Sequence, residues 1–419
     1  MINKIEQLLK RTEKYTKMDM VYFVESGAWV TFGQIVSSGM TFLLALAFAN
    51  LLPKEVYGQY KYILGVTGLL GALTLTGLET SVIQAVSRGY EGVLKTAFRK
   101  NIAWSFLLTT SAIGAAIYYM YFEENSVLAY SLWIAAFLVP FTRSAQLYSS
   151  YLNGKKLFRI KIGYETASTI VAGIALVAAV YFSGRVFVII SAYFISYFIL
   201  SLFFYYRTMR VYAPNNMTDP EFMGYAKHLS FLNVLDIIAS NIDKVLVFNF
   251  VGPAALAIYS FAIGIPEQTK PFLKGITNII LPRFSERSEG DIRRNLGNKI
   301  VKMLLFNAVI TTSYIAFAPL LYGLFFPQYH ESVFYSQIFA VSLLAGSITP
   351  IEIFLLAKKK IKEQYVVRMS VSLFQIVSVF VFTFWLGLAG LILARVATRF
   401  FVAAANLFIY FRMPAEEIG

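Results

Sequence analysis

Twelve apolar stretches recur along the chain, each close to the ~20 residues that a helix needs to cross the hydrocarbon core of a bilayer. In lipid the backbone finds no hydrogen-bond partner outside its own helix, so apolar stretches of this length fold as helices. The sequence therefore predicts an all-α polytopic membrane protein with twelve transmembrane helices. We place these helices at residues 27–51, 61–84, 102–121, 127–151, 162–183, 186–206, 229–250, 255–282, 300–324, 332–356, 366–386 and 389–411.

Composition agrees with a membrane protein. The chain is 58% hydrophobic and 14% charged, whereas soluble domains carry roughly 25% charged residues. Its net charge of +14 would suggest a nucleic-acid partner in a soluble protein, but here cytoplasmic loops that follow the positive-inside rule explain it. Among the predicted outer loops, Lys and Arg occur only at Lys54, Lys61 and Arg185. Both termini are therefore predicted to be cytoplasmic, and no nucleic-acid partner is expected.

The longest predicted loop, 207–228, divides the helices six and six. Segments 202–207 and 407–412 are similar, as are Gly154-Lys155-Lys156 and Ala357-Lys358-Lys359. This similarity predicts two pseudo-symmetric six-helix bundles. The N-lobe would be 1–206, including an amphipathic helix over residues 1–20 that lies on the membrane surface. Residues 207–228 would form a cytoplasmic linker, and 229–419 would form the C-lobe with a short tail.

Charged residues at membrane depth mark the seventh and eighth predicted helices. In the seventh, the spacing of Asn233, Asp236, Ser240 and Asp243 places them on one face, and Lys244 follows directly. In the eighth, Glu267, Lys270 and Lys274 share a face beside Pro266 and Pro271. A charge in the centre of a lipid-facing helix costs roughly 2.5–3.5 kcal/mol on insertion scales. These side chains are therefore expected to face a water-filled cavity or, alternatively, to form structural ion pairs between helices.

Further charges fall inside predicted helices at Arg143, Arg395 and Arg399. Glu79, Glu165 and Glu352 lie near cytoplasmic helix ends, where they would snorkel or pair with loop lysines. The deep cations outnumber the deep acids. Pairing among them is one interpretation, and the surplus of positive charge favours an anionic ligand such as a phosphate or carboxylate. The candidate binding residues are Arg143, Lys244, Lys270, Lys274, Arg395 and Arg399, and the candidate partner or ion-coupling acids are Asp236, Asp243, Glu267 and Glu79.

Patterns of several enzyme classes are missing from the sequence. It contains no G-x-x-x-x-G-K-[ST] phosphate loop, no H-E-x-x-H and no D-x-D. It has no Cys and only two His residues, which argues against thiolate chemistry and a His-built metal site. The predicted outer loops are short for a membrane glycosyltransferase or polymerase. The sequence therefore predicts neither an enzyme nor a resident cofactor or metal.

Several motifs, taken in order, resemble those of one transporter family. They are Leu52-Pro53…Val56-Tyr57-Gly58-Gln59-Tyr60, Gly77-Leu78-Glu79, Asn153-Gly154-Lys155-Lys156, Asp243 with Val251-Gly252-Pro253…Tyr259, and Leu281-Pro282-Arg283-Phe284-Ser285. Together they are similar to the Wzx-type oligosaccharide flippases, which are polysaccharide biosynthesis proteins of the multidrug/oligosaccharidyl-lipid/polysaccharide (MOP) exporter superfamily. One position differs from the family pattern: in the second half the usual Gly-x-Tyr motif reads Ala257-x-Tyr259, with alanine in place of glycine.

This resemblance implies a MATE-like fold of two lobes around a cationic central cavity, in a bacterial or archaeal cytoplasmic membrane. It implies alternating access that moves an undecaprenyl-diphosphate-linked oligosaccharide to the outer leaflet. An H⁺ or Na⁺ gradient would drive the cycle, and membrane lipids and other polysaccharide assembly proteins would be partners. The alternative is a MATE-like drug/cation antiporter of the same superfamily, whose cavity should be acidic and aromatic rather than basic.

Overall fold

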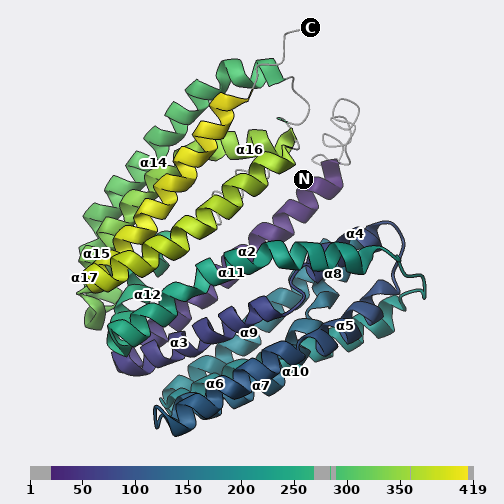
Figure 1. Ribbon diagram of the computed structural model, residues 1–419, viewed down its shortest axis with the longest axis horizontal. Helices are drawn as coiled ribbons and strands as arrows, with labels where there is room; N and C mark the ends of the chain where they lie inside the picture. The colour runs from purple at the N-terminus through teal and green to yellow at the C-terminus, as the bar shows by residue number, and fades with distance from the viewer. Residues whose placement is uncertain (1–19, 269–283, 285–288, 359, 414–419) are drawn as a thin grey trace, which may run out of the picture. The chain divides into compact units, whose positions relative to one another are not determined.

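A computed structural model describes residues 20–268, 284, 289–358 and 360–413 (Figure 1). These residues form helices and short 3₁₀ turns, with no β-strand among them. The chain is therefore all-α, as predicted. In order, the elements are α2 (Met20–Leu51), α3 (Lys54–Leu70), η1 (Gly71–Leu73), α4 (Leu78–Ser87), α5 (Val93–Trp104), α6 (Phe106–Tyr121), α7 (Ser126–Ala145), α8 (Leu147–Gly154), α9 (Phe158–Phe182), α10 (Val186–Tyr212), α11 (Phe222–Phe250), α12 (Pro253–Glu267), α14 (Glu289–Phe325), η2 (Pro327–Tyr329), α15 (Ser332–Ala340), η3 (Val341–Ile348), α16 (Thr349–Ala357) and α17 (Ile361–Arg412).

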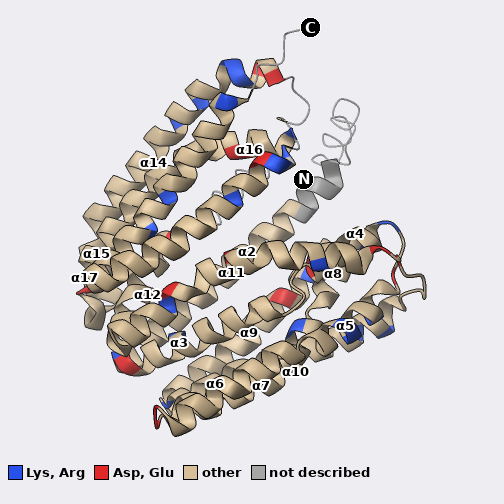
Figure 2. Cartoon of the chain, viewed as in Figure 1, with Lys and Arg blue, Asp and Glu red and all other residues tan. Residues whose placement is uncertain are grey.

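Within the described ranges, eight helical segments are long and apolar enough to cross a membrane, or nine if an interrupted pair counts as one. Figure 2 shows the long helices as mostly uncharged rods. The chain is therefore a multi-pass membrane protein, while the number twelve stays a prediction. The segments are Gly27–Leu51, Val93–Tyr121, Ser126–Gly154, Phe158–Phe182, Val186–Tyr212, Glu289–Phe325, Ser332–Ala357 and Lys362–Arg412, and the pair is Lys54–Leu73 with Leu78–Ser87.

The second predicted span, 61–84, is interrupted rather than continuous. Helix α3 ends at Leu70, and α4 begins only at Leu78. Gly71 and Gly77 flank the break, and glycine costs a helix about 1 kcal/mol relative to alanine. The backbone N–H of Gly77 donates to Ser230 Oγ at 2.9 Å instead of to a helical carbonyl. The local sequence therefore breaks the span where apolar content alone predicted one helix.

The last helix, α17, is a hairpin of two helices. Gly387 lies inside it with φ 57° and ψ −134°, a conformation that glycine adopts readily and that ends the helical path. The rings of Phe374 and Phe401, on either side of this turn, stack with centroids 4.2 Å apart. The two halves therefore pack against each other, in agreement with the separate stretches predicted at 366–386 and 389–411.

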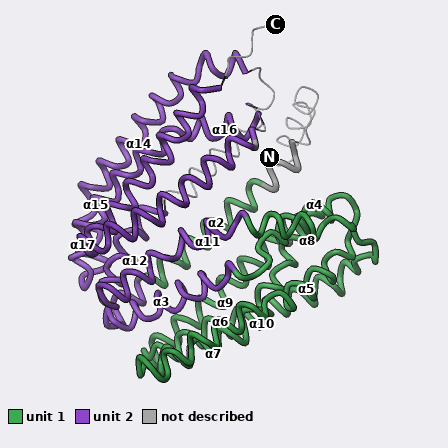
Figure 3. The backbone as a smooth tube through the Cα atoms, in the orientation of Figure 1, with its two compact units in different colours: residues 1–45, 73–231 green, residues 46–72, 232–419 purple. Residues whose placement is uncertain are grey.

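The chain divides into two compact units, coloured separately in Figure 3. Unit 1 contains residues 1–45 and 73–231, and unit 2 contains residues 46–72 and 232–419. These units differ from the predicted lobes, because residues 46–72, with α3, group with the second half of the sequence. The pseudo-symmetry of the two halves stays a prediction, and the predicted surface helix at residues 1–20 falls almost wholly outside the described residues.

Unit 1 is built around the packing of α4 against α8 and of α7 against α6 and α10. Its core includes Leu78, Val82, Leu94 and Tyr151, all nearly inaccessible to solvent. A side chain at Gly154 would approach Ile83 O and Val86 Cβ to 2.8 Å each. The glycine of the Asn153-Gly154-Lys155-Lys156 motif is therefore needed because α4 and α8 approach each other closely there.

Loop 213–221, within the predicted linker, is ordered by contacts with the turn between α4 and α5. Asn215 Nδ2 donates to Gly89 O at 3.0 Å, and the N–H of Gly92 donates to Met217 O at 2.9 Å. An ion pair between Arg88 and Asp219, at 2.6 Å, adds a third contact. The loop is therefore part of unit 1, between the end of α10 at Tyr212 and the start of α11 at Phe222. The cytoplasmic linker at 207–228 stays a prediction.

Glu91, in the same turn, provides a pH-dependent test of this packing. Burial alone raises its pKa, but hydrogen bonds from Lys155, at 2.6 Å, and Tyr151, at 2.9 Å, outweigh it and hold the pKa below the ordinary glutamate value. A lowered carboxyl pKa stabilises the fold above the ordinary carboxyl range, and this contribution is lost as pH falls through the lowered value.

We expect Glu91→Gln to lower the unfolding temperature of the detergent-solubilised protein at pH 7, with a difference that shrinks as the pH falls below 5. Thermal unfolding followed by intrinsic fluorescence between pH 4 and pH 8 measures this difference. The matched control is Glu221→Gln, an exposed carboxylate of the same loop region. If the unfolding temperature of the wild type exceeded that of Glu91→Gln by a growing amount as the pH fell, the role given to Glu91 would be wrong.

Unit 2 packs α12 against α3 and α15, and α17 against α15 and α16. Pro253 is the first residue of α12, after Gly252 with φ 114°, so the predicted Gly252-Pro253 turn between two helices is confirmed. Gly58 of α3 lies so close to the Pro253 carbonyl that no side chain would fit there. In the same unit the rings of Phe261 of α12 and Tyr329 of η2 are in contact, with centroids 4.0 Å apart and planes tilted by 38°. The packing holds α12 in position and so sets the place of Tyr259 and Glu267.

Candidate functional site

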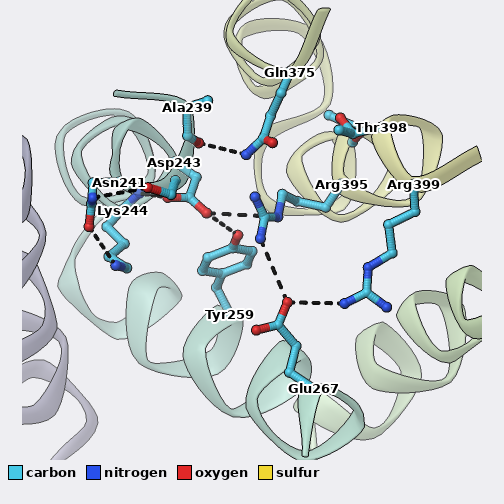
Figure 4. A network of polar contacts seen from close by, with 12 residues as sticks. Ala239, Asn241, Asp243, Lys244, Tyr259, Glu267, Gln375, Arg395, Thr398 and Arg399 are labelled. Atoms are coloured by element: carbon cyan, nitrogen blue, oxygen red, sulfur yellow. Dashed lines mark hydrogen bonds and ion pairs between the residues drawn. The ribbon is translucent and has the colours of Figure 1, made fainter. Parts of the chain in front are cut away.

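A polar network inside unit 2 joins α11, α12 and α17 (Figure 4). At its centre is Asp243 of α11, whose side chain is only 2% exposed. Tyr259 of α12 donates its hydroxyl to Asp243 Oδ2, and Arg395 of α17 approaches the same oxygen with Nε at 4.0 Å. A buried carboxylate needs such partners because desolvation penalises an unpaired charge heavily. Asp243 is thus held by one hydroxyl and one guanidinium from two other helices.

Glu267, near the end of α12, lies between the two arginines of α17 in Figure 4. Its Oε1 is 3.7 Å from Arg395 Nη2 and accepts a hydrogen bond from Arg399 Nη2 at 3.1 Å. The Arg399 guanidinium also lies over the ring of Phe339, 4.7 Å from its centroid. Arg395 and Arg399 are one helical turn apart, so both reach one carboxylate from the same face. Arg399 and Glu267 thus form an ion pair, and the anion-binding role of Arg399 stays a prediction.

Lys244 belongs to the same region but points away from Arg395 (Figure 4). Its Nζ donates to Asn241 Oδ1 at 3.0 Å, and its backbone N–H donates to Asp243 Oδ1 at 2.9 Å. Asp243 and Glu267 attract it electrostatically, whereas Lys61 and Arg395 repel it. The network therefore contains three cations, at Lys244, Arg395 and Arg399, against two carboxylates, and an anion would relieve the surplus.

Asp236 and Asn233, one and two helical turns before Ser240 on α11, bind a different partner. Arg368 of α17 forms an ion pair with Asp236 and donates to Asn233 Oδ1 at 2.9 Å. Ser372, one turn after Arg368, also donates to Asp236. Three residues of the polar stripe predicted on α11 therefore contact α17, in two separate groups: Asn233 and Asp236 with Arg368, and Asp243 with Arg395.

Sequence reasoning missed Arg368 and Gln375. Arg368 closely follows a run of lysines, Lys358 to Lys362, and such a run is typical of a cytoplasmic loop. Gln375 donates to the Ala239 carbonyl at 2.6 Å. A signal was available, since Arg368, Ser372 and Gln375 follow the spacing of one helical face. Tyr259 was identified only as a motif residue, without its contact to Asp243.

Arg143 and Glu79 of unit 1 interact electrostatically with each other, and Arg143 also interacts with Tyr193. Glu165 pairs with Lys161 at 3.2 Å, as expected for a boundary glutamate. Whether Arg143 shares a cavity with the cations of unit 2 stays a prediction. Lys270 and Lys274 lie outside the described residues, so their role also stays a prediction. Among the described side chains, no group of three or more His, Cys, Asp and Glu is placed to hold a metal ion.

Comparison with solved structures identifies proteins of the same fold. A structure of the lipid II flippase MurJ in an inward closed conformation matches with a TM-score of 0.69 and 14% identity, covering 93% of this chain and 88% of that one. A MOP superfamily transporter from Pyrococcus furiosus, described as having a binding pocket of reverse polarity, matches with a TM-score of 0.59 and 14% identity, covering 92% of this chain and 95% of that one. An inward-facing MATE family transporter matches with a TM-score of 0.63 and 12% identity, covering 90% of this chain and 94% of that one. At these identities the matches show a shared fold, which confirms the predicted fold class.

Comparison with curated protein sequences found no match. The family model described as polysaccharide biosynthesis protein matches residues 47–327, which is more than half of the chain. The match includes α3, α11 and α12, and with them Asp243, Tyr259 and Glu267. It agrees with the family that the motifs resembled. The chain belongs to the polysaccharide biosynthesis protein family.

Proposed function

We propose that this protein is a flippase that moves an undecaprenyl-diphosphate-linked oligosaccharide from the cytoplasmic to the outer leaflet of a bacterial or archaeal cytoplasmic membrane. The observation that carries the proposal is a network on α11, α12 and α17 of a polysaccharide biosynthesis protein. Its three cations, Lys244, Arg395 and Arg399, outnumber its two carboxylates, Asp243 and Glu267. A protein of the same fold is named a lipid II flippase, which supports a lipid-linked substrate.

The diphosphate would bind by exchange with Glu267. Arginine forms two parallel hydrogen bonds to phosphate oxygens, and such charge-assisted bonds are about twice as strong as neutral ones. Arg399 is 21% exposed and Arg395 is 16% exposed, so Arg399 is the arginine that a ligand reaches more easily. Substrate would thereby break the contact between α12 and α17, which gives it the differential affinity for one conformation that a transport cycle requires.

The carboxylates supply a place for ion coupling in this proposal. Asp236, Asp243 and Glu267 each hold an arginine, and protonation or Na⁺ binding at any of them would weaken that pair. An H⁺ or Na⁺ gradient would then return the protein to its starting state by alternating access. Both termini would be cytoplasmic, as the distribution of Lys and Arg predicts.

A MATE-like drug/cation antiporter is the rival function, because MATE transporters share the fold. A site for an organic cation should contain more carboxylates than cations, since desolvated charge needs an opposite partner. The network of Asp243, Glu267, Lys244, Arg395 and Arg399 has the reverse balance. The charges therefore favour an anionic headgroup, while the fold alone favours neither function.

A cellular test uses a strain that encodes this protein and makes a surface polysaccharide. Deleting the gene should abolish surface polysaccharide and increase the pool of lipid-linked oligosaccharide on the cytoplasmic side, and the wild-type gene should restore both. Surface labelling and mass spectrometry of extracted lipids measure the two quantities. Normal surface polysaccharide in the deletion strain, or a changed resistance to cationic drugs as its sole phenotype, would contradict the flippase and favour the antiporter.

A further inference from the structure

Unit 2 contains a second polar site, a pocket of about 280 Å³ beside the Arg368–Asp236 ion pair. Among the described residues, those that line it lie in α11, α16 and α17. The aliphatic part of the lining consists of leucine and valine side chains. Its hydrogen-bonding part consists of six residues, Asp236, Glu352, Gln364, Arg368, Ser372 and Asn406.

Glu352 shows that the pocket has unused binding capacity. Its side chain is exposed to the pocket, although α16 lies in an apolar span. Among the residues that the structure describes, no side chain pairs with or donates to its carboxylate. A carboxylate that the described side chains leave unpaired keeps its acceptor oxygens open to a ligand. Arg368, with 47% of its side chain exposed, also keeps donors available beyond its bonds to α11.

We infer that this pocket binds a sugar ring of the transported glycan. A sugar hydroxyl both donates and accepts hydrogen bonds, so it suits a lining that mixes carboxylates, amides, a hydroxyl and a guanidinium. The leucine and valine side chains would pack against the apolar C–H face of the ring. The inference rests on the proposed function, because it assigns part of the same substrate to a second site.

The charge of the lining argues against a phosphate here. Two carboxylates, Asp236 and Glu352, face one guanidinium, that of Arg368, so the pocket is net negative, unlike the network around Arg399. A metal cation is disfavoured because Arg368 repels it and, within the described chain, no cluster of three metal-ligating side chains occurs. A neutral group rich in hydroxyls matches the lining without leaving a surplus charge.

The position of the pocket suits a single substrate that reaches both sites. Asp236 and Asp243 are seven residues apart on α11, and Arg399 and Asn406 are seven residues apart on α17. At 1.5 Å per residue, both intervals correspond to about 10 Å. Two helices thus give the same separation between the pocket and the arginine network, about the length of a disaccharide. A diphosphate at Arg399 would place the first sugars of the glycan within reach of the pocket.

The test uses the full-length protein in detergent and exploits its lack of cysteine. Val371, an aliphatic lining residue, is changed in Val371→Cys and labelled with a maleimide. Thr218→Cys, on the exposed loop of unit 1, is the matched control. The probes are the free oligosaccharide released by mild acid from the lipid-linked pool, undecaprenyl diphosphate, NaCl and tetraphenylphosphonium. We expect only the free oligosaccharide to slow labelling of Val371→Cys severalfold, with no change at Thr218→Cys.

Two substitutions of Glu352 separate a sugar from a cation. Loss of a hydrogen bond to a charged group is worth about tenfold in affinity or more. For a sugar, Glu352→Leu should weaken oligosaccharide binding by about that factor, and Glu352→Gln should keep most of the affinity because the amide still bonds hydroxyls. For a cation, both variants should lose binding alike. Thermal unfolding of each variant shows that it remains folded.

Protection of Val371→Cys by NaCl or tetraphenylphosphonium, or no protection by the oligosaccharide, would overturn the sugar site. Transport of the intact lipid-linked oligosaccharide by wild-type proteoliposomes is measured in parallel. Transport without protection would reject the pocket and leave the flippase standing. Absence of transport in the wild type would instead reject the proposed function itself.

Discussion

Arg395→Met is expected to unfold or severely destabilise unit 2 and to abolish transport. Arg395 is the one cation within ion-pair distance of Asp243 in the described part of the chain, and the Asp243 side chain is 2% exposed. Removing one partner of a buried ion pair leaves an uncompensated charge, which costs about 3–5 kcal/mol. The unfolding temperature of the purified protein and the yield of monodisperse protein measure this loss.

The double variant Asp243→Asn with Arg395→Met removes both charges and keeps an acceptor for the Tyr259 hydroxyl. It should recover most of the lost stability, because replacing a whole buried pair is often neutral. It should not recover transport if Arg395 also supports substrate binding. A single Arg395→Met variant as stable as the wild type would contradict the partnership with Asp243.

Arg399→Ala should reduce transport by about tenfold to a hundredfold and change stability little. The charge-assisted hydrogen bonds that it would give to a phosphate are worth roughly 1.5–3 kcal/mol. Stability should persist because Glu267 keeps its contact with Arg395 at 3.7 Å and is 26% exposed. The initial rate of lipid-linked oligosaccharide flipping in proteoliposomes measures the effect. Arg399→Lys should retain part of the rate, since lysine keeps the charge but not the paired donors.

Two controls distinguish binding from packing in this experiment. Arg412→Ala changes an exposed arginine at the end of the same helix and should transport normally. Glu267→Ala combined with Arg399→Ala removes the whole pair. Recovered transport in that double variant would show that Arg399 serves only to neutralise Glu267, and the substrate-binding role would then be wrong.

The helices of the fold were predictable because hydropathy reports span length directly. The hairpin in α17 could also be predicted, since Gly387 interrupts an otherwise continuous apolar run. The break between α3 and α4 was missed because Gly71 and Gly77 sit inside a stretch whose mean hydropathy remains high. Hydropathy also carries no information on which helices pack together. The grouping of residues 46–72 with unit 2 depends on close contacts such as that between Gly58 and Pro253.

The candidate site was predictable as a set of residues but not as a set of pairs. The common face of Asp236 and Asp243 follows from helical periodicity. Their partners do not, because pairing depends on which helix packs against that face. Arg368 could not be recognised as a partner of Asp236 from the sequence, because a charge close to a run of loop lysines is expected to be a cytoplasmic loop residue. Lys270, which the sequence predicts to share a helical face with Glu267, lies outside the described residues, so its part in the site stays a prediction.

The most direct test of the proposed function is flipping by the purified wild-type protein in sealed proteoliposomes. Undecaprenyl-diphosphate-linked oligosaccharide carrying a radiolabelled sugar is placed in the membrane, and a glycosidase or lectin outside reports its arrival. The account predicts flipping that depends on the protein, is strongly reduced in Arg399→Ala and is competed by undecaprenyl diphosphate. Transport of tetraphenylphosphonium without any flipping of the lipid-linked oligosaccharide would contradict the account.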